Sequence, residues 1–112
     1  MGKGSVYIGD KDNRFFRRDM SFDDLRDIMA LDYPYYLLDV RDDWEYEEGF
    51  IRGAVNIPLS FLDSRVGELP KDRPIIVYCR TIACGTEAAN RLRVLGFDNV
   101  TILNGDFRDW RE

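Results

Sequence analysis

The sequence predicts an α/β domain in which a parallel sheet carries helices on both faces. Two observations lead to this fold class. Short apolar runs alternate with segments of helical periodicity, and those runs are as continuous as expected for strands buried on both faces. Strands that alternate with helices need crossover connections, which make neighbouring strands parallel. The 112 residues and an apolar content of 45% suit one domain with a single core.

The first helix is expected to begin at Ser21, because this serine can cap a helix and acidic residues follow it. Its apolar face is expected to consist of Phe22, Leu25, Ile28 and Met29. Residues 1–20 fit the alternation poorly, so we predict that they form an N-terminal arm or an edge strand at 5–8. Residues 21–112 are then the domain itself.

The later elements follow in the same alternation. Strands are expected at 35–40, 54–58, 75–78 and 100–103, helices at 61–69 and 86–95, and helical turns at 44–48 and 105–110. The helix at 86–95 should end at Gly96 in a Schellman cap, with Phe97 as its hydrophobic contact.

Polar residues follow two of these strands, and a parallel sheet brings such strand ends to one edge. Asp39 and Arg41 lie at the end of the 35–40 run, and Cys79 follows the strand at 75–78. Ligands of open parallel sheets bind at the carboxyl ends of the strands. The candidate site is therefore at this edge.

Cys79 lies between a strand and a following helix, where backbone N–H groups and the helix dipole favour a thiolate over a thiol. The chain has no histidine that could remove the thiol proton. Any nucleophilic role of Cys79 must therefore depend on backbone N–H groups and arginine. The alternative interpretation is a buried, inert cysteine.

Composition excludes several classes of function. A net charge of −5 argues against nucleic-acid binding, and no apolar run approaches the roughly 20 residues of a membrane helix. Two cysteines without histidine predict neither a disulfide framework nor a metal site. The start lacks the apolar region of a signal peptide, so we expect a cytoplasmic protein. We also expect that the protein uses no cofactor.

The residues around both strand ends resemble a rhodanese-like domain over about 21–110. The first half of the resemblance is carried by Ile51 and by the segments 38–41, 44–46, 48–49 and 53–58. The second half is carried by 77–79, 88–89, 95–97 and the single residues Leu92, Val100, Leu103, Gly105 and Trp110.

This resemblance implies a three-layer α/β/α fold around a mainly parallel five-stranded sheet. It also implies a sulfurtransferase that carries sulfane sulfur as a persulfide on Cys79. The implied donor is thiosulfate, a persulfide or a polysulfide, and the acceptor is a thiol, cyanide or a protein. The resemblance also implies that the pair Asp39 and Arg41, at the end of the neighbouring strand, supports the loop that follows Cys79. The implied substrate-binding loop after Cys79 consists of Arg80, Thr81, Ile82, Ala83, Cys84 and Gly85.

Three positions depart from the family pattern. Ile82 stands where a small residue is usual, Cys84 where an arginine is usual, and Gly85 where serine or threonine is usual. A related phosphatase mechanism needs an arginine at position 85 and is rejected. Weak turnover of thiosulfate with cyanide is expected, because position 84 lacks the arginine that would bind the donor anion.

These departures leave alternatives open. Cys84 is either a resolving thiol for a Cys79 persulfide, one half of a redox switch, or a small residue that fills space. Arg80 either recognises an anion or is a solvated loop tip. The competing functions are a thiol-dependent sulfane reductase and a binding or regulatory module that has lost activity.

Overall fold

The computed structural model describes residues 18–111, and their helices and strands alternate as predicted. The strands are β2 Asp19–Met20, β3 Tyr36–Asp39, β4 Val55–Asn56, β5 Ile75–Tyr78 and β6 Val100–Leu103. The α-helices are α2 Phe22–Leu31, α3 Asp43–Glu48, α4 Leu62–Arg65 and α5 Ile82–Val94. The 3₁₀ turns are η1 Leu59–Phe61, η2 Val66–Glu68 and η3 Phe107–Asp109.

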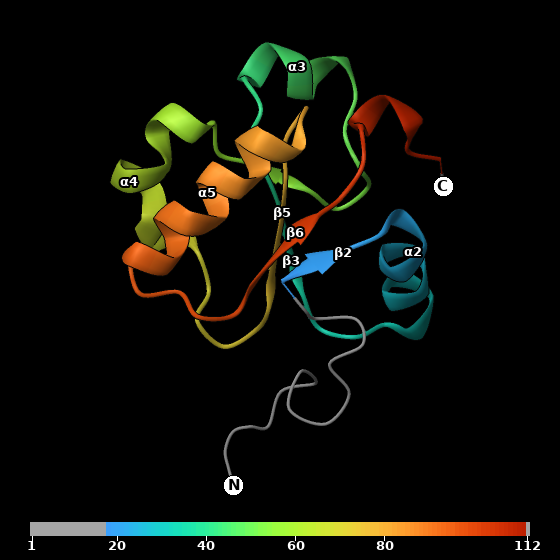
Figure 1. The fold of residues 1–112 in the computed structure, drawn as a ribbon, viewed down its shortest axis with the longest axis horizontal. Helices are drawn as coiled ribbons and strands as arrows, with labels where there is room; N and C mark the ends of the chain where they lie inside the picture. The colour runs from blue at the N-terminus through green and yellow to red at the C-terminus, as the bar shows by residue number, and fades with distance from the viewer. Residues whose placement is uncertain (1–17, 112) are drawn as a thin grey trace, which may run out of the picture.

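The strands form one five-stranded sheet in the order β2-β6-β5-β3-β4, with every neighbouring pair parallel. In Figure 1, α4 and α5 lie on one side of the sheet and α2 on the other, while α3 lies above the ends of the strands. The predicted three-layer α/β/α fold is therefore confirmed.

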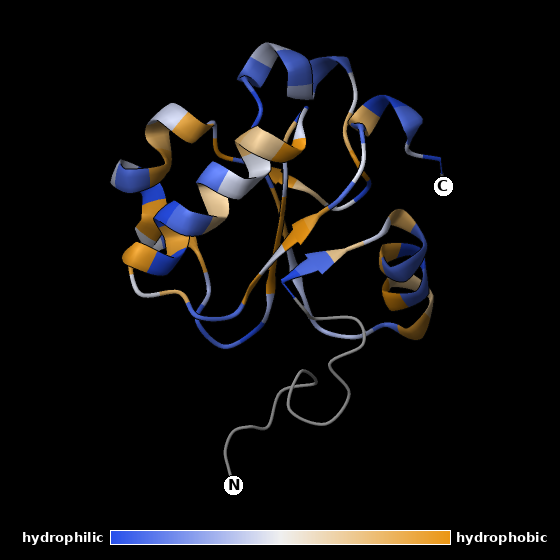
Figure 2. Cartoon of the chain, in the orientation of Figure 1, coloured by the Kyte–Doolittle hydropathy of each residue, from blue (hydrophilic) through white to orange (hydrophobic). Residues whose placement is uncertain are grey.

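Both faces of the sheet are buried, as the continuous apolar runs predicted. Along β5, Ile75 and Val77 pack on the side of α4 and α5, whereas Ile76 and Tyr78 pack on the side of α2. Figure 2 shows hydrophobic residues along the central strands and a hydrophilic α3 above them. The rigid core thus ends at the carboxyl edge of the sheet, where polar residues begin.

The predicted helix ends at Ser21 and Gly96 are confirmed. Ser21 forms a capping box with Asp24, in which each side chain accepts a hydrogen bond from the backbone of the other residue. At the end of α5 the N–H of Phe97 donates to Leu92 at 3.0 Å and that of Gly96 to Arg93 at 3.1 Å. This is the Schellman pattern, and Gly96 has the positive φ of 102° that it requires.

The single helix expected at 61–69 is wrong, because the chain forms η1, α4 and η2 there in succession. Gly67 disfavours a continued helix, and Leu69 is extended as the residue before a proline should be.

The strand expected at 5–8 lies outside the described residues. The edge of the sheet beside β6 is formed by β2, whose Met20 accepts a hydrogen bond from Asn104. The division of the chain at residue 20 stays a prediction. Within residues 18–111, no helix is both long and apolar enough to cross a membrane.

Candidate active site

Cys79 is the first residue after β5 and lies at the carboxyl edge of the sheet. The carbonyl of Tyr78 accepts a hydrogen bond from the N–H of Val40 at 3.0 Å, which fixes the end of β5 against the residue that follows β3. The Cys79 side chain is 8% exposed and borders a cavity of about 290 Å³. We call this cavity the cysteine pocket; its polar lining consists of Arg41, Asp42, Glu45, Arg80, Thr81 and the two cysteines.

The loop after Cys79 is shorter than predicted, because α5 begins at Ile82 and not at Thr86. Thr81 caps the helix: its hydroxyl accepts from the N–H of Cys84 at 3.2 Å, and its carbonyl from that of Gly85 at 3.1 Å. A threonine in extended conformation can satisfy these N–H groups, which favours the earlier start.

Only Arg80 and Thr81 of the expected substrate-binding loop precede α5, and its other four residues are helical. A role of these six residues in substrate binding stays a prediction. Ile82, Ala83, Cys84 and Gly85 form the first turn of α5, and the N–H groups of the last two are occupied within that turn. A β-carbon at Gly85 would lie 3.4 Å from the Ile102 side chain, so α5 packs closely on β6 at this position. Ile82 is helical and needs no positive φ.

The earlier helix start places Cys84 opposite Cys79. Their sulfurs are joined in a disulfide, with the two α-carbons 5.8 Å apart. This separation lies within the range in which a bridge forms without moving the backbone. Both cysteines of the chain are in this bond. Cys84 therefore lies within bonding reach of the candidate nucleophile.

Asp39 and Arg41 form a buried ion pair at the end of β3. The guanidinium donates to the Asp39 carboxylate at 2.7–3.1 Å, and the backbone N–H of Arg41 donates to it at 2.9 Å. Asp39 is fully buried and Arg41 is 5% exposed. Burial lowers the pKa of Arg41, but hydrogen bonds and charge from Asp39 outweigh burial and raise it. The predicted pairing of the two residues is present.

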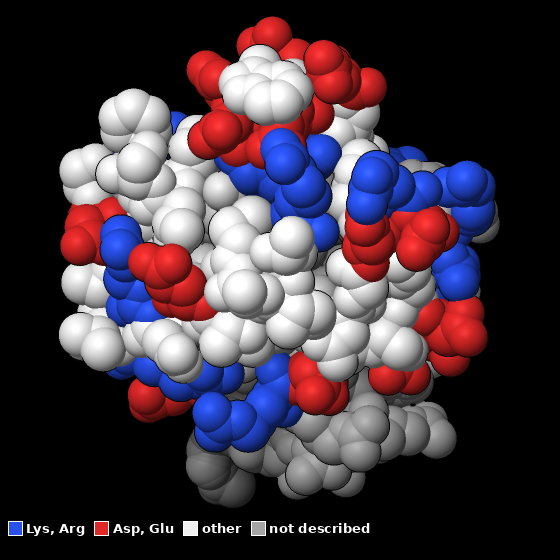
Figure 3. All heavy atoms as spheres, turned by 45° about the horizontal axis from the view of Figure 1, so that its top comes forward, with Lys and Arg blue, Asp and Glu red and all other residues white. Residues whose placement is uncertain are grey.

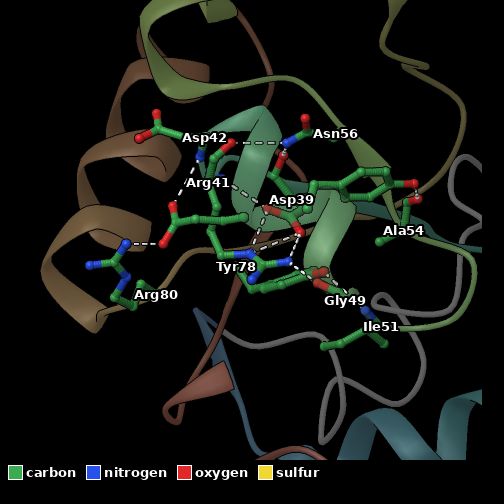
Figure 4. A network of polar contacts seen from close by, with 11 residues as sticks. Asp39, Arg41, Asp42, Gly49, Ile51, Ala54, Asn56, Tyr78 and Arg80 are labelled. Atoms are coloured by element: carbon green, nitrogen blue, oxygen red, sulfur yellow. Dashed lines mark hydrogen bonds and ion pairs between the residues drawn. The ribbon is translucent and has the colours of Figure 1, made fainter. Parts of the chain in front are cut away.

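The pair holds α3 in place. Arg41 also donates to the carbonyl of Gly49 at 2.7 Å (Figure 4). Its guanidinium lies 4.0 Å from the centroid of the Phe107 ring. We expected the pair to support the loop after Cys79, but these contacts of Arg41 are with the end of α3 and with η3. Tyr78 lies nearby and accepts from the N–H of Ile51 at 3.1 Å. Burial, followed by the charge of Asp39, raises the pKa of this phenol, so it stays protonated.

Glu45 links α3 to the cysteine loop and was not singled out by the sequence analysis. One carboxylate oxygen accepts from the N–H of Asp42 at 3.1 Å, and the other forms an ion pair with the Arg80 guanidinium (Figure 4). Arg80 is therefore paired with a carboxylate, although its side chain is 53% exposed. The spacing Asp42-x-x-Glu45 is that of a capping box and could have identified the helix start, although not the contact with Arg80.

A second hollow of about 400 Å³ adjoins the cysteine pocket. We call it the aromatic hollow; it is lined by Trp44, Glu48, Gly49, Phe107 and Arg108, and it shares Arg41, Glu45 and Arg80 with the cysteine pocket. Figure 3 shows acidic side chains gathered where α3 lies, with basic side chains directly beneath. Arg108 already pairs with Asp106, and its hydrogen bonds lower the pKa of that carboxyl to about 2.

The arrangement can perform thiol chemistry. It offers a cysteine at the edge of the sheet, a second cysteine within bonding distance, and an arginine beside them. Within residues 18–111 no group of three or more histidine, cysteine or acidic side chains is placed to hold a metal ion.

Comparison with known proteins agrees with this fold and site. A family model described as a rhodanese-like domain matches residues 4–112. The chain therefore belongs to the rhodanese-like domain family, and the resemblance drawn from the sequence is confirmed.

Relatives of known name include sulfurtransferases. The chain is 36% identical over 76 residues to the thiosulfate sulfurtransferase GlpE of Shewanella oneidensis, covering 68% of this chain and 75% of GlpE. It is 42% identical over 74 residues to the uncharacterized protein YqhL of Bacillus subtilis, covering 66% of this chain but only 59% of YqhL. The human single-domain sulfurtransferase TSTD1 has a TM-score of 0.74 at 28% identity, covering 84% of this chain and 95% of TSTD1.

Proposed function

We propose that the protein transfers sulfane sulfur through a persulfide on Cys79. The observation that carries this proposal is the position of Cys79, which follows β5 directly and borders the cysteine pocket. Family membership and the sulfurtransferases among the relatives support the same reaction class. We also propose a cytoplasmic location, where thiol acceptors are kept reduced.

The reaction has two half-steps. In the first, the Cys79 thiolate attacks the outer sulfur of the donor, a sulfur–sulfur bond forms on Cys79, and the donor leaves as sulfite or as a thiolate. In the second, an acceptor thiolate or cyanide attacks the outer sulfur of this persulfide, and Cys79 leaves as a thiolate. No net oxidation or reduction of Cys79 occurs.

A second candidate function is favoured by the Cys79–Cys84 disulfide. Here the Cys84 thiolate attacks the inner sulfur of the Cys79 persulfide and sulfide leaves with the bonding electrons. The protein then holds the disulfide, and two equivalents of a small thiol reduce it to the dithiol. The protein would act as a thiol-dependent sulfane reductase, and Cys84 would be its resolving thiol.

Intact mass spectrometry of the reduced protein after treatment with polysulfide tests the proposal. We expect the Cys84→Ser variant to gain one sulfur atom and the Cys79→Ser variant to gain none. Because Cys84→Ser cannot form the disulfide, its persulfide should persist long enough to be detected. If neither polysulfide nor thiosulfate loads Cys79 in the folded protein, sulfur transfer is excluded and the binding-module alternative is favoured.

A further inference from the structure

Glu45 and Arg80 form a charge pair on the boundary between the cysteine pocket and the aromatic hollow. Both residues line both cavities. The Glu45 side chain is 12% exposed, whereas that of Arg80 is 53% exposed. The carboxylate is thus the buried partner, and the arginine reaches it from the solvent side.

The Glu45 carboxylate cannot easily turn away from this position. Its other oxygen is held by the N–H of Asp42, and α3 is fixed at its far end by the bond from Arg41 to Gly49. An anion that needs the Arg80 guanidinium must therefore compete with a carboxylate that is already in place. It must also approach a fixed negative charge beside the cysteine.

The remaining charges of the cysteine pocket do not compensate for Glu45. Arg41 is engaged by the buried carboxylate of Asp39, and Asp42 adds a second acidic side chain to the lining. Cys84 contributes no charge where the family resemblance leads one to expect an arginine. The pocket at Cys79 therefore has little net positive charge to offer a dianion.

We propose that Glu45 is a specificity-determining residue, which neutralises Arg80 and selects against dianionic sulfur donors. The substrate class favoured by this arrangement is an organic persulfide, which carries at most one negative charge on its sulfur. The aromatic hollow, with Trp44 and Phe107 in its lining, provides space for the organic group next to the ion pair. The inference rests on the proposed persulfide chemistry of Cys79.

The test is a comparison of donors in the Glu45→Gln variant. Glutamine retains the capping box, so α3 should be preserved while the negative charge is lost. We expect kcat/KM for thiosulfate to rise about tenfold or more, mainly through a lower KM, because Arg80 becomes free to donate charge-assisted hydrogen bonds. For a small alkyl persulfide the same parameter should change by no more than about twofold.

Two further variants separate this role from a general effect of charge. Glu47→Gln removes the same charge from an exposed position of α3 and should leave the donor preference unchanged. Adding Arg80→Ala to Glu45→Gln should remove most of the gain with thiosulfate. An unchanged preference in Glu45→Gln, or an equal gain in Glu47→Gln, overturns the inference.

Failure of the inference is distinguishable from failure of the proposed function. Each variant is first prepared with the additional change Cys84→Ser, so that the persulfide persists, and is loaded with polysulfide. The mass of its Cys79 persulfide is then measured. If Cys79 is loaded in all variants but the donor preference does not change, Glu45 has no role in specificity. If no variant is loaded, the persulfide mechanism itself is wrong and the inference fails with it.

Discussion

Cys84 lies in the first turn of α5 with its sulfur bonded to that of Cys79 and its α-carbon 5.8 Å from that of Cys79. The Cys84 sulfur can thus reach Cys79, the proposed nucleophile, without a movement of the helix. The position comes from the Thr81 cap, which starts α5 early enough to include Cys84. Because the disulfide occupies Cys79, the proposed loading by a donor requires prior reduction.

The first prediction concerns the release of sulfide. Reduced wild-type protein treated with one equivalent of polysulfide should release sulfide and end as the Cys79–Cys84 disulfide. Cys84→Ser should instead retain the sulfur on Cys79, because no internal thiolate can displace it. Sulfide is measured colorimetrically without added thiol, and the bridge by peptide mapping under non-reducing conditions. Equal release from both proteins would show that Cys84 only fills space.

The second prediction concerns the state of reduced Cys79. The N-terminus of α5 lies close to it, and the helix dipole there favours a thiolate. The rate of iodoacetamide alkylation of Cys79 in Cys84→Ser should therefore reach half its maximum below a pH of about 8.5, the value for a free thiol. The same variant unfolded in denaturant is the control. A midpoint at or above the free-thiol value in the folded variant contradicts a nucleophilic role.

The sequence was sufficient to predict most of the fold because its strands are short and buried on both faces. The strands at 75–78 and 100–103 were predicted at their observed bounds, since short runs rich in apolar and β-branched residues are typical of strands buried on both faces. The helix at 86–95 was predicted to begin four residues too late. Its first turn has no apolar periodicity, and only the side chain of Thr81 marks the start.

The site was predicted less completely, because its contacts join residues far apart in the sequence. Asp39 and Arg41 are two residues apart on one strand, so their pairing could be predicted. The pairing of Glu45 with Arg80 depends on how α3 is placed above β5, which no local pattern specifies. The acidic residues of α3 therefore give no local sign that the side chain of Glu45 is largely buried.

The third prediction concerns the stability provided by the Asp39–Arg41 pair. Asp39→Asn should lower the free energy of unfolding by about 3–5 kcal/mol, because it leaves the buried guanidinium without a counter-charge. Urea denaturation at neutral pH measures this change. Glu68→Gln is the matched control, since it removes one carboxylate from an exposed pair with Arg65 and should have little effect. A similarly small effect of Asp39→Asn would show that water replaces Asp39 in stabilising the charge of Arg41.

The last prediction concerns Gly105, which connects β6 to the η3 turn. This glycine has a φ of +128°, and a β-carbon there would lie 2.6 Å from the ring of Phe22. The ring cannot easily yield, because it packs edge-on against Trp110 with the ring centroids 5.3 Å apart. Gly105→Ala should therefore lower the free energy of unfolding by about 1–3 kcal/mol.

Gly105→Ala should also affect the site, since η3 carries Phe107, which lies against the Arg41 guanidinium. A displaced η3 would loosen Arg41 and the end of α3, so loading of Cys79 at a fixed polysulfide concentration should slow in the folded fraction. Gly67→Ala is the control, because its β-carbon would meet nothing within 4 Å and its φ is not positive. That variant should be neutral or slightly more stable and should load sulfur at the wild-type rate. If both alanine variants behave alike in denaturation and in loading, the close contact with Phe22 does not constrain this turn.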